Sequence, residues 1–389
     1  MVRVAKRISE TAKKDFGMYE KAAELAASGR DLIHLEVGRP YADTPDHIKQ
    51  ATIASLLAGN VHYSDLSGSL KLRRAIADKL RTQNSITATP DEVLITNGLT
   101  HGSFAAFLAL LDPGDEVILL EPYYPQHIGK IELAGARPVM AKLDTARGFS
   151  IRPDLIAERI SSRTRMVVLI NPVNPTGRVY RRSELQGLAD LAIKHDLIVV
   201  SDEVYEDIVY DRNTHISIAS LPGMKERTIS LFAFTKSFAM DGWRLGYLTA
   251  GAALIPALLK ITVNDVAHVN TFIQDGAYAA ITGPRRVLLD LVADDRHKRE
   301  LVVQRLNQMP GVTCPLPEGT IYVFPDIREV GIPSQRLAEL ILERADVVVE
   351  AGSFYGPTGE GHLRICFGSE SIERLEQGMS RLNDFFNKL

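Results

Sequence analysis

The chain has 389 residues, which allows two or three domains or one large domain with a smaller companion. Apolar residues make up 45% and charged residues 24%, as in ordinary soluble globular proteins. The formal net charge of −3 gives no global attraction to nucleic acid or to an anionic membrane. Two cysteines are too few for a disulfide framework or a four-cysteine metal centre, so we expect no metal site.

No targeting or membrane segment is visible in the sequence. The first ten residues include three basic side chains, but the apolar core of a signal peptide does not follow them. The longest apolar runs are far shorter than the roughly 20 residues of a membrane helix. We therefore expect a cytoplasmic protein with neither a membrane nor a nucleic acid as its partner.

Seven short apolar runs predict buried β-strands. Each run is continuous rather than alternating, which is typical of a parallel sheet with both faces covered. Helical patterns lie between many of them, including 103–111, entered from Thr100, and 182–195, with Ser183 as its N-cap. Strands that alternate with helices predict a parallel α/β sheet. The predicted strands are 93–96, 117–120, 138–141, 166–170, 197–201, 228–232 and 246–250.

The two ends of the chain have a different pattern. A helical segment, 10–29, precedes a strand-like run at 32–37. Residues 275–305 are rich in helical pattern, and the rest of the C-terminal part mixes both element types. There the predicted strands are 320–324 and 362–367, and the predicted helices are 335–344 and 372–388. We predict a large domain at 46–280 and a smaller α+β domain made of 1–45 and 281–389.

Four polar groups follow the ends of predicted strands. In open α/β sheets, ligands bind outside the carboxyl ends of the strands. Taken singly, each group has an ordinary explanation as a turn former, a cap or a solvated charge. Taken together, they predict one site that contains an Asn, an Asp, a Tyr and a Lys. The groups are 171–177, 202–205, 234–237 and 242–246.

These residue types suit pyridoxal 5'-phosphate (PLP). Its aldehyde requires an amine, which Lys236 supplies as a Schiff base. Its pyridine nitrogen requires a carboxylate, which Asp202 supplies, so that the ring remains an electron sink. Its phenolic oxygen requires hydrogen-bond donors, and Asn174 and Tyr205 offer them.

The phosphate and the ring face of this cofactor have candidate partners as well. The segment 97–100 follows a strand and opens a helix, which gives an anion site of backbone N–H groups. Arg244 adds a charge-assisted hydrogen bond. Tyr123 and Tyr124 follow the strand at 117–120, and either ring can face the cofactor.

At these residues the sequence resembles the class I and II aminotransferases of PLP fold type I, the aspartate aminotransferase-like superfamily. The resemblance extends from Leu35 to Phe367 and implies an α/β fold with a large domain, built on a mostly parallel seven-stranded sheet, and a smaller α+β domain. The motifs that carry it, in family order, are Leu-Glu-Val-Gly-Arg-Pro at 35–40, Tyr-Ser-Asp-Leu-Ser-Gly at 63–68, Asp-Pro-Gly-Asp-Glu-Val at 112–117, the segments 171–177 and 202–205, Lys236 with Arg244, and His-Leu-Arg-Ile at 362–365.

The resemblance implies catalytic roles for Lys236, Asp202 and Tyr205. Lys236 forms the Schiff base and moves the proton between Cα and C4′, and Asp202 pairs with the pyridinium nitrogen. Tyr205 and Asn174 donate to the phenolic oxygen. Tyr124 matches the ring-stacking position better than Tyr123 does.

The resemblance also implies a phosphate cup and a substrate site. Gly98, Leu99, Thr100 and Arg244 match the cup. Tyr63 is similar to a tyrosine that reaches the phosphate of the neighbouring subunit, which implies a homodimer with shared active sites. In the substrate site, Arg364 matches the arginine that holds the α-carboxylate of the substrate. Gly38 brings the backbone close to that carboxylate, and Asn174 helps to orient the substrate.

Three positions leave alternatives open. Arg39 stands where relatives often have an acidic residue or Gln, and it either reaches a polar or acidic substrate tail or forms a surface ion pair. Ala233 replaces a serine that commonly donates to the phosphate, and Thr235 is a possible substitute. The segment 16–19 matches a substrate-closing lid, and its aromatic and Met side chains either line the pocket or pack in the core.

The predicted reaction is transfer of an amino group between an L-amino acid and a 2-oxo acid. Another PLP reaction on the same scaffold, by a C–S β-lyase, a synthase or a decarboxylase, stays open, and Tyr205 favours transamination because C–S lyases often have His there. A non-catalytic PLP-binding regulator is disfavoured, because the 31 residues before Leu32 are too few for a DNA-binding module.

Overall fold

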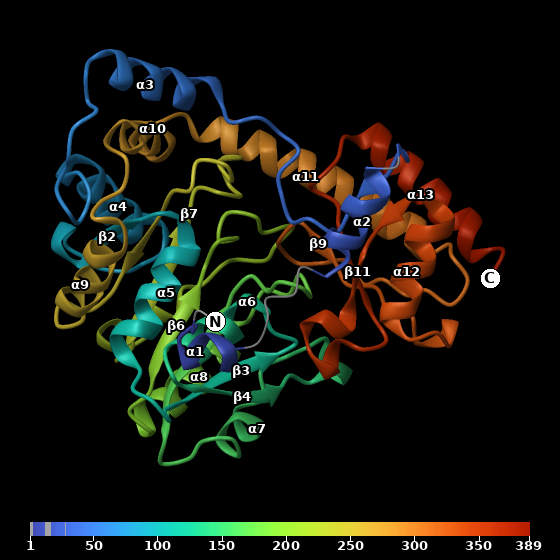
Figure 1. The fold of residues 1–389 in the computed structure, drawn as a ribbon, viewed down its shortest axis with the longest axis horizontal. Coiled ribbons are helices and arrows are strands. Elements are labelled where there is room, and N and C mark those ends of the chain that lie inside the picture. The colour runs from blue at the N-terminus through green and yellow to red at the C-terminus, as the bar shows by residue number, and fades with distance from the viewer. Residues whose placement is uncertain (1–2, 12–16, 28) are drawn as a thin grey trace.

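The structure is a computed structural model, and it describes residues 3–11, 17–27 and 29–389. Within these ranges the chain forms a larger part around one sheet and a smaller part that joins helix Met18–Ala26 and strand Ile33–His34 to the C-terminal end, whereas helix Lys6–Glu10 lies against the larger part (Figure 1). None of the helices in these ranges combines the length and the apolar character needed to cross a membrane.

A seven-stranded sheet forms the centre of the larger part, and all seven predicted strands are present in it. β8 runs antiparallel to both neighbours, and the other strands are parallel to one another. The fold class predicted from the sequence is confirmed. In spatial order the strands are β2 (Val93–Thr96), β8 (Gly246–Thr249), β7 (Thr228–Ala233), β6 (Ile198–Asp202), β5 (Thr164–Ile170), β3 (Glu116–Glu121) and β4 (Arg137–Lys142).

The direction of β8 differs from the prediction that every continuous apolar run belongs to a parallel sheet. The segment 234–245 forms no helix, so the chain turns back beside β7 instead of crossing over. Gly246 is therefore opposite Ala233 of β7 and Thr96 of β2. This reversal brings the start of β8 to the edge where the parallel strands end.

Helices cover both faces of the sheet, because alternate side chains of each strand point to opposite faces. Met166 and Val168 pack in the core under α5, α6 and α9, whereas Val167 and Leu169 pack under α8. A third cluster joins the β2 side of the sheet to α3, α4 and α10. The bounds are α3 Asp46–Leu57, α4 Leu70–Gln83, α5 Gly98–Leu110, α6 Gln126–Leu133, α7 Pro153–Ala157, α8 Arg182–Lys194, α9 Ile255–Val266 and α10 Thr271–Thr282.

Helix α5 begins at Gly98, within the segment 97–100 that is predicted to open it, and the pattern at 103–111 corresponds to its later turns. A Cβ added at Gly102 would lie 3.2 Å from Leu231 of β7, so glycine permits this close approach. Helix α8 has Arg181 as its N-cap, not Ser183, because the Glu184 carboxylate accepts the Arg181 backbone N–H at 2.9 Å.

The smaller part combines α2 and β1 with the C-terminal elements, whereas α1 (Lys6–Glu10) lies against α6 of the larger part (Figure 1). β1 pairs with β10 in parallel, and β12 lies between β11 and β9 in an antiparallel sheet. The bounds are β1 Ile33–His34, β9 Tyr322–Val323, β10 Val347–Val348, β11 Glu350–Ala351, β12 Leu363–Cys366, α2 Met18–Ala26, α11 Arg285–Leu306, α12 Ser334–Ala345, α13 Ile372–Phe386 and the 3-10 helix η6 Gly352–Tyr355.

One hydrophobic core joins these distant segments. Met18 of α2 and Leu35 after β1 share it with Leu337 of α12 and Leu375 of α13. Tyr205 of the larger part also reaches it. The division into 46–280 and 1–45 with 281–389 stays a prediction, and α1 lies against α6 of the larger part and not in this core.

Candidate active site

A cavity of about 560 Å³ lies where the carboxyl edge of the large sheet faces the strands of the smaller part. Its walls come from segments that follow β2, β3, β5, β6 and β7 and from α2, β9, β11, η6 and β12. The carboxyl ends of parallel strands lie at the same edge of a sheet, so the residues that follow the strands meet in one cavity. The predicted site residues that line it are Gly38, Leu99, Thr100, Tyr124, Asn174, Asp202, Tyr205, Lys236, Arg244 and Arg364.

Lys236 extends into the cavity from the segment after β7. Its Nζ donates a hydrogen bond to the Gly38 carbonyl oxygen. Burial lowers the pKa of the Lys236 amine to about 8. A buried lysine with a lowered pKa has a neutral fraction near pH 7 and is a nucleophile and a base.

Asp202 is the last residue of β6 and is 5% exposed. Its Oδ1 accepts the Val204 backbone N–H at 3.2 Å. Burial raises the pKa of the Asp202 carboxyl to about 6, because a charged group loses its hydration there. A protonated heterocyclic nitrogen is the kind of partner that stabilises such a carboxylate.

Tyr205 and Tyr322 form a buried pair. Their hydroxyl oxygens are 2.7 Å apart, and the ring centroids are 5.7 Å apart in an edge-on arrangement. Burial raises the pKa of Tyr205 well above its usual value, so the hydroxyl keeps its proton. A Cβ at Gly38 would overlap the Tyr322 hydroxyl, which explains glycine at this position.

Gly98 and Arg244 meet at the N-terminus of α5. A Cβ added at Gly98 would lie 2.7 Å from Arg244 Nη2, so only glycine lets the guanidinium approach the first helical turn so closely. Arg244 Nη1 donates to the Asp241 carbonyl at 2.9 Å, and its φ of 52° is uncommon for a residue with a side chain. Backbone N–H groups beside a guanidinium suit a phosphate.

Arg364 of β12 forms the opposite wall and is 6% exposed. Its Nη1 is 3.4 Å from Asn174 Oδ1, and its Nη2 donates to the Glu36 carbonyl. The guanidinium carbon lies 4.5 Å from the centroid of the Tyr322 ring. Its buried Nε has no hydrogen-bond partner in the described part of the chain, which leaves a donor for a carboxylate ligand.

The structure distinguishes between two pairs of alternatives: which of Tyr123 and Tyr124 faces the cavity, and whether the lid segment 16–19 lines the pocket or packs in the core. Tyr124 lines the cavity, whereas Tyr123 donates its backbone N–H to the Tyr355 carbonyl at 3.0 Å and is not part of this wall. In the lid segment, Tyr19 lines the cavity and Met18 is buried in the core. Phe16, which belongs to the same prediction, lies outside the described residues.

Three predicted residues do not line this cavity: Gly98, which lies beside Arg244 at the start of α5, Arg39 and Tyr63. Arg39 is exposed, so the structure does not bring it to the substrate site within one chain. Tyr63 is 88% exposed and packs edge-on against His268 at 5.0 Å, and its predicted partner is the phosphate of another subunit. Both roles stay predictions. Thr235 lines the cavity, and Ala233 does not.

Several wall residues have no role in the sequence-based prediction. Glu36 lies inside a quoted motif without a role, and the C-terminal residues lie in short strands or turns whose pairing depends on distant segments. Only Tyr322 could have been suspected from the sequence, because it lies in the predicted strand 320–324 and a buried tyrosine hydroxyl requires a hydrogen-bond partner. The lining residues without a predicted role are Glu36, Val37, Pro125, Gln126, Ile170, Val204, Tyr322, Glu350, Phe354 and Tyr355.

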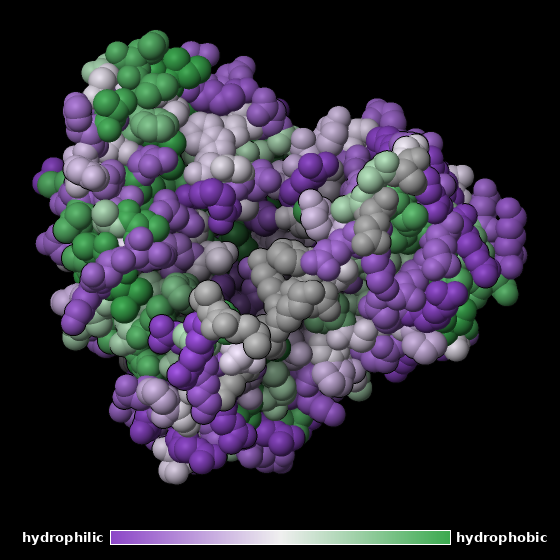
Figure 2. Space-filling view, in the orientation of Figure 1, coloured by the Kyte–Doolittle hydropathy of each residue, from purple (hydrophilic) through white to green (hydrophobic). Residues whose placement is uncertain are grey.

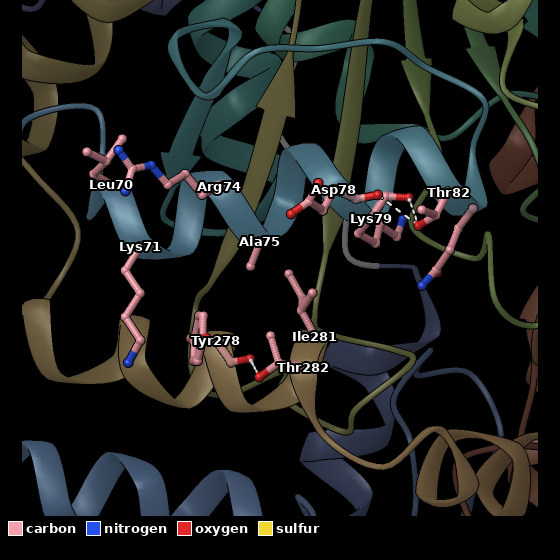
Figure 3. A pocket seen from close by; sticks show the side chains of 11 residues that line it. Leu70, Lys71, Arg74, Ala75, Asp78, Lys79, Thr82, Tyr278, Ile281 and Thr282 are labelled. Carbon is pink, nitrogen blue, oxygen red and sulfur yellow. Dashed lines mark hydrogen bonds between the residues drawn. The ribbon is translucent and has the colours of Figure 1, made fainter.

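A second hollow of about 600 Å³ lies between α4 and α10 (Figure 3). Two of its lysines already have partners: Lys79 pairs with Glu206, and Lys71 Nζ lies 4.0 Å from the centroid of the Tyr278 ring. It contains none of the predicted site residues, and we assign it no function.

The fold and this cavity define a class of protein, the PLP-dependent transferases of fold type I. The chain belongs to the aminotransferase class I and II family, which it matches over residues 30–382. It is similar to an aspartate aminotransferase from Pyrococcus abyssi, with 38% identity over 93% of both chains. It is also similar to an arginine–pyruvate transaminase from Pseudomonas aeruginosa, with 36% identity over 94% of this chain and 93% of that one.

Solved structures agree with this assignment. The aspartate aminotransferase of Rhizobium meliloti superposes with a TM-score of 0.96 at 29% identity, and each chain is covered completely. The chain is thus an aminotransferase. The names of its relatives differ in the amino donor, so they do not select one for this chain.

Proposed function

We propose that this chain binds PLP through Lys236 and uses it to move an amino group between an L-amino acid and a 2-oxo acid. The observation that carries the proposal is the presence of a half-buried amine of lowered pKa, a buried carboxyl and a buried guanidinium in one cavity. The residues fit the cofactor. Asp202 is a buried carboxyl that a cation would stabilise, and Gly98 lets the Arg244 guanidinium approach the first turn of α5, where an anion would be attracted.

PLP, when bound, supplies an electron sink for the negative charge that develops at the substrate Cα. Lys236 would hold the cofactor through its amine, and the freed amine would take the Cα proton at Nζ. A pKa of about 8 suits this task, because a general base works best when its pKa is near the operating pH. Asp202 would keep the ring nitrogen protonated, and Tyr205 with Asn174 would donate to the phenolic oxygen.

Arg364 would bind the α-carboxylate of the substrate in a bidentate manner. Asn174 lies beside its Nη1 and would share that carboxylate. Two fixed contacts at one end of a small substrate restrict its rotation, so the Cα–H bond keeps a constant direction relative to Lys236. Tyr124 would cover the ring face and exclude water.

A half-reaction experiment tests this function. The protein loaded with PLP, mixed with one L-amino acid and no acceptor, is expected to convert its absorbance to that of the amine form of the cofactor. Addition of a 2-oxo acid is expected to reverse the change, and borohydride is expected to attach the cofactor to the peptide that contains Lys236. Ammonia and pyruvate released without an acceptor would instead indicate a lyase.

We also propose a homodimer with shared active sites. Exposed apolar side chains gather on α3 and the segment after it, where Figure 2 shows hydrophobic colouring. They are Ile53, Leu56, Leu57, Val61 and Leu66, and Tyr63 lies among them. Such a contiguous patch is typical of a protein interface.

A cytoplasmic location suits the two cysteines, which are free and buried.

The dimer predicts a defect for Tyr63→Ala. Sedimentation equilibrium of the wild-type protein is expected to give two chains per particle. The variant is expected to bind PLP about tenfold more weakly, because one hydrogen bond to a charged phosphate is lost. Equilibrium dialysis measures this affinity. A monomeric wild-type protein, or a Tyr63→Ala dimer with unchanged affinity, would contradict the proposal.

A further inference from the structure

Two buried carboxyl groups lie beside Arg364 in the cavity wall. Glu36 follows β1, Glu350 opens β11, and both are 3% exposed. Glu350 is the cross-strand partner of Arg364, so the two side chains are neighbours on one face of the sheet. The transamination mechanism gives neither carboxyl a role.

Neither carboxylate forms an ion pair with a lysine or an arginine within the described residues, although the charge of Arg364 acts on Glu350 from a longer distance. Glu36 Oε1 is 2.9 Å from His34 Nδ1, and its buried Oε2 has no hydrogen-bond partner there. Glu350 accepts two backbone N–H groups, from Met18 at 3.1 Å and Ala351 at 3.0 Å. Arg364 does not form an ion pair with Glu350, because its guanidinium is directed to the Glu36 carbonyl and to Asn174.

Burial raises the pKa of Glu350 to about 7, although the Arg364 charge and the two backbone N–H groups favour the charged form. Glu36 makes a smaller contribution that raises the pKa further. Two neighbouring buried carboxylates repel each other and are stabilised by a cation placed between them.

The adjoining wall is aromatic. Tyr19 of α2 and Phe354 and Tyr355 of η6 line the same cavity. Aromatic faces attract guanidinium and ammonium groups. The cationic residues of this wall, Lys236, Arg244 and Arg364, are already assigned to the cofactor and the α-carboxylate, so no cation that lines the cavity remains for a distal carboxylate of a substrate, and Arg39 lies outside the cavity.

We propose that Glu36 and Glu350, with Tyr19, Phe354 and Tyr355, form a subsite for a cationic side chain of the amino donor. The preferred donors are then amino acids that end in a guanidinium or ammonium group, and dicarboxylic amino acids are disfavoured. This inference rests on the proposed function and adds the substrate class.

A donor panel in the half-reaction tests the subsite. The PLP-loaded enzyme is mixed with L-arginine, L-citrulline, L-lysine, L-norleucine or L-aspartate, and kcat/KM is measured for each. Citrulline and norleucine match arginine and lysine in size but are neutral. Arginine and lysine are expected to exceed their neutral counterparts by about tenfold or more, as expected for a charge-assisted hydrogen bond.

Variants connect this preference to the two carboxyls. Glu350→Gln and Glu36→Gln are each expected to lower the arginine-to-citrulline ratio by about tenfold. The ratio cancels a general loss of folded enzyme, and the two variants test the subsite independently. Glu20→Gln is the matched control, since Glu20 is exposed on α2 next to Tyr19, and its ratio is expected to equal that of the wild type.

The outcomes separate the two proposals. Equal rates with arginine and citrulline, or aspartate as the best donor, would overturn the cationic subsite while leaving transamination intact. Unchanged ratios in both glutamine variants would overturn the role of these carboxyls. If no donor of any charge converts the cofactor, the proposed function fails and the subsite fails with it.

Discussion

Lys236→Ala is expected to lower the rate of the half-reaction by about 10⁴-fold or more. The variant loses the group that would hold the cofactor and the base that would move the Cα proton, and proton transfer alone contributes roughly 10²–10⁴-fold in enzymes. Rapid-mixing absorbance measurements with a saturating amino donor determine the rate constant. The bound cofactor is expected to dissociate on dialysis, because only non-covalent contacts remain.

Lys236→Arg separates the charge of Lys236 from its basicity. A guanidinium keeps the positive charge but does not lose its proton near pH 7, whereas burial lowers the pKa of Lys236 to about 8. The arginine variant is therefore expected to be as inactive as the alanine variant. Lys194→Ala, at the exposed end of α8, is the control and is expected to keep the wild-type rate. A Lys236→Arg rate within tenfold of the wild type would contradict the base role.

Asp202→Asn is expected to slow the same half-reaction by about 10²–10³-fold, the usual cost of removing a preorganised electrostatic partner of a developing charge. Asparagine has the same shape and can still accept the Val204 N–H, so the change removes mainly the negative charge. The rate of cofactor conversion and the proton content of the ring, read from the absorbance spectrum, are the measurements.

The pH dependence of this variant adds a second readout. Burial raises the pKa of Asp202 to about 6 in the chain without cofactor, so the carboxyl gains a proton as the pH falls through that value. A folded-state pKa above that of the unfolded chain stabilises the fold at low pH and loses this contribution as the pH rises through about 6. In cofactor-free protein, the decrease in unfolding free energy across this range is expected to be smaller for Asp202→Asn.

Two further variants serve as controls for Asp202→Asn. Asp202→Glu keeps the charge on a longer side chain and is expected to retain more activity than Asp202→Asn. Asp190→Asn, at an exposed position of α8, is expected to change neither the rate nor the pH profile. If Asp202→Asn reacts within threefold of the wild-type rate, Asp202 is not the partner of the ring nitrogen.

Local sequence patterns predicted the large sheet well. Most of its strands are short apolar runs whose two faces are both buried, and such runs are recognisable without knowledge of their neighbours, whereas the edge strand β4 is only partly buried. The strand-end residues Asp202, Lys236 and Asn174 were predictable for the same reason, since each directly follows such a run or comes a few residues after it. The family resemblance added Arg364, which no local pattern assigns.

The smaller part was harder to predict in detail. Its predicted strand at 32–37 pairs only over Ile33–His34, because β10, its partner, is only two residues long and lies more than 300 residues away. Pairing between such distant segments depends on the packing of α2, α12 and α13 around them. For this reason Glu350, Phe354 and Tyr355 could not be assigned to the cavity from their own surroundings in the sequence.

The sequence by itself determined the class of sheet, the order of its strands along the chain and the residue types of the cofactor site, because these depend on local hydrophobic runs and on the chemistry of single side chains. Only the tertiary structure decided the reversed direction of β8, which brings Arg244 beside Gly98. It also brought Glu36 and Glu350 to the wall beside Arg364. These relations join segments far apart in the chain, and the free energy that selects them comes from burying α2 and the segment around β1 with the C-terminal elements in one core.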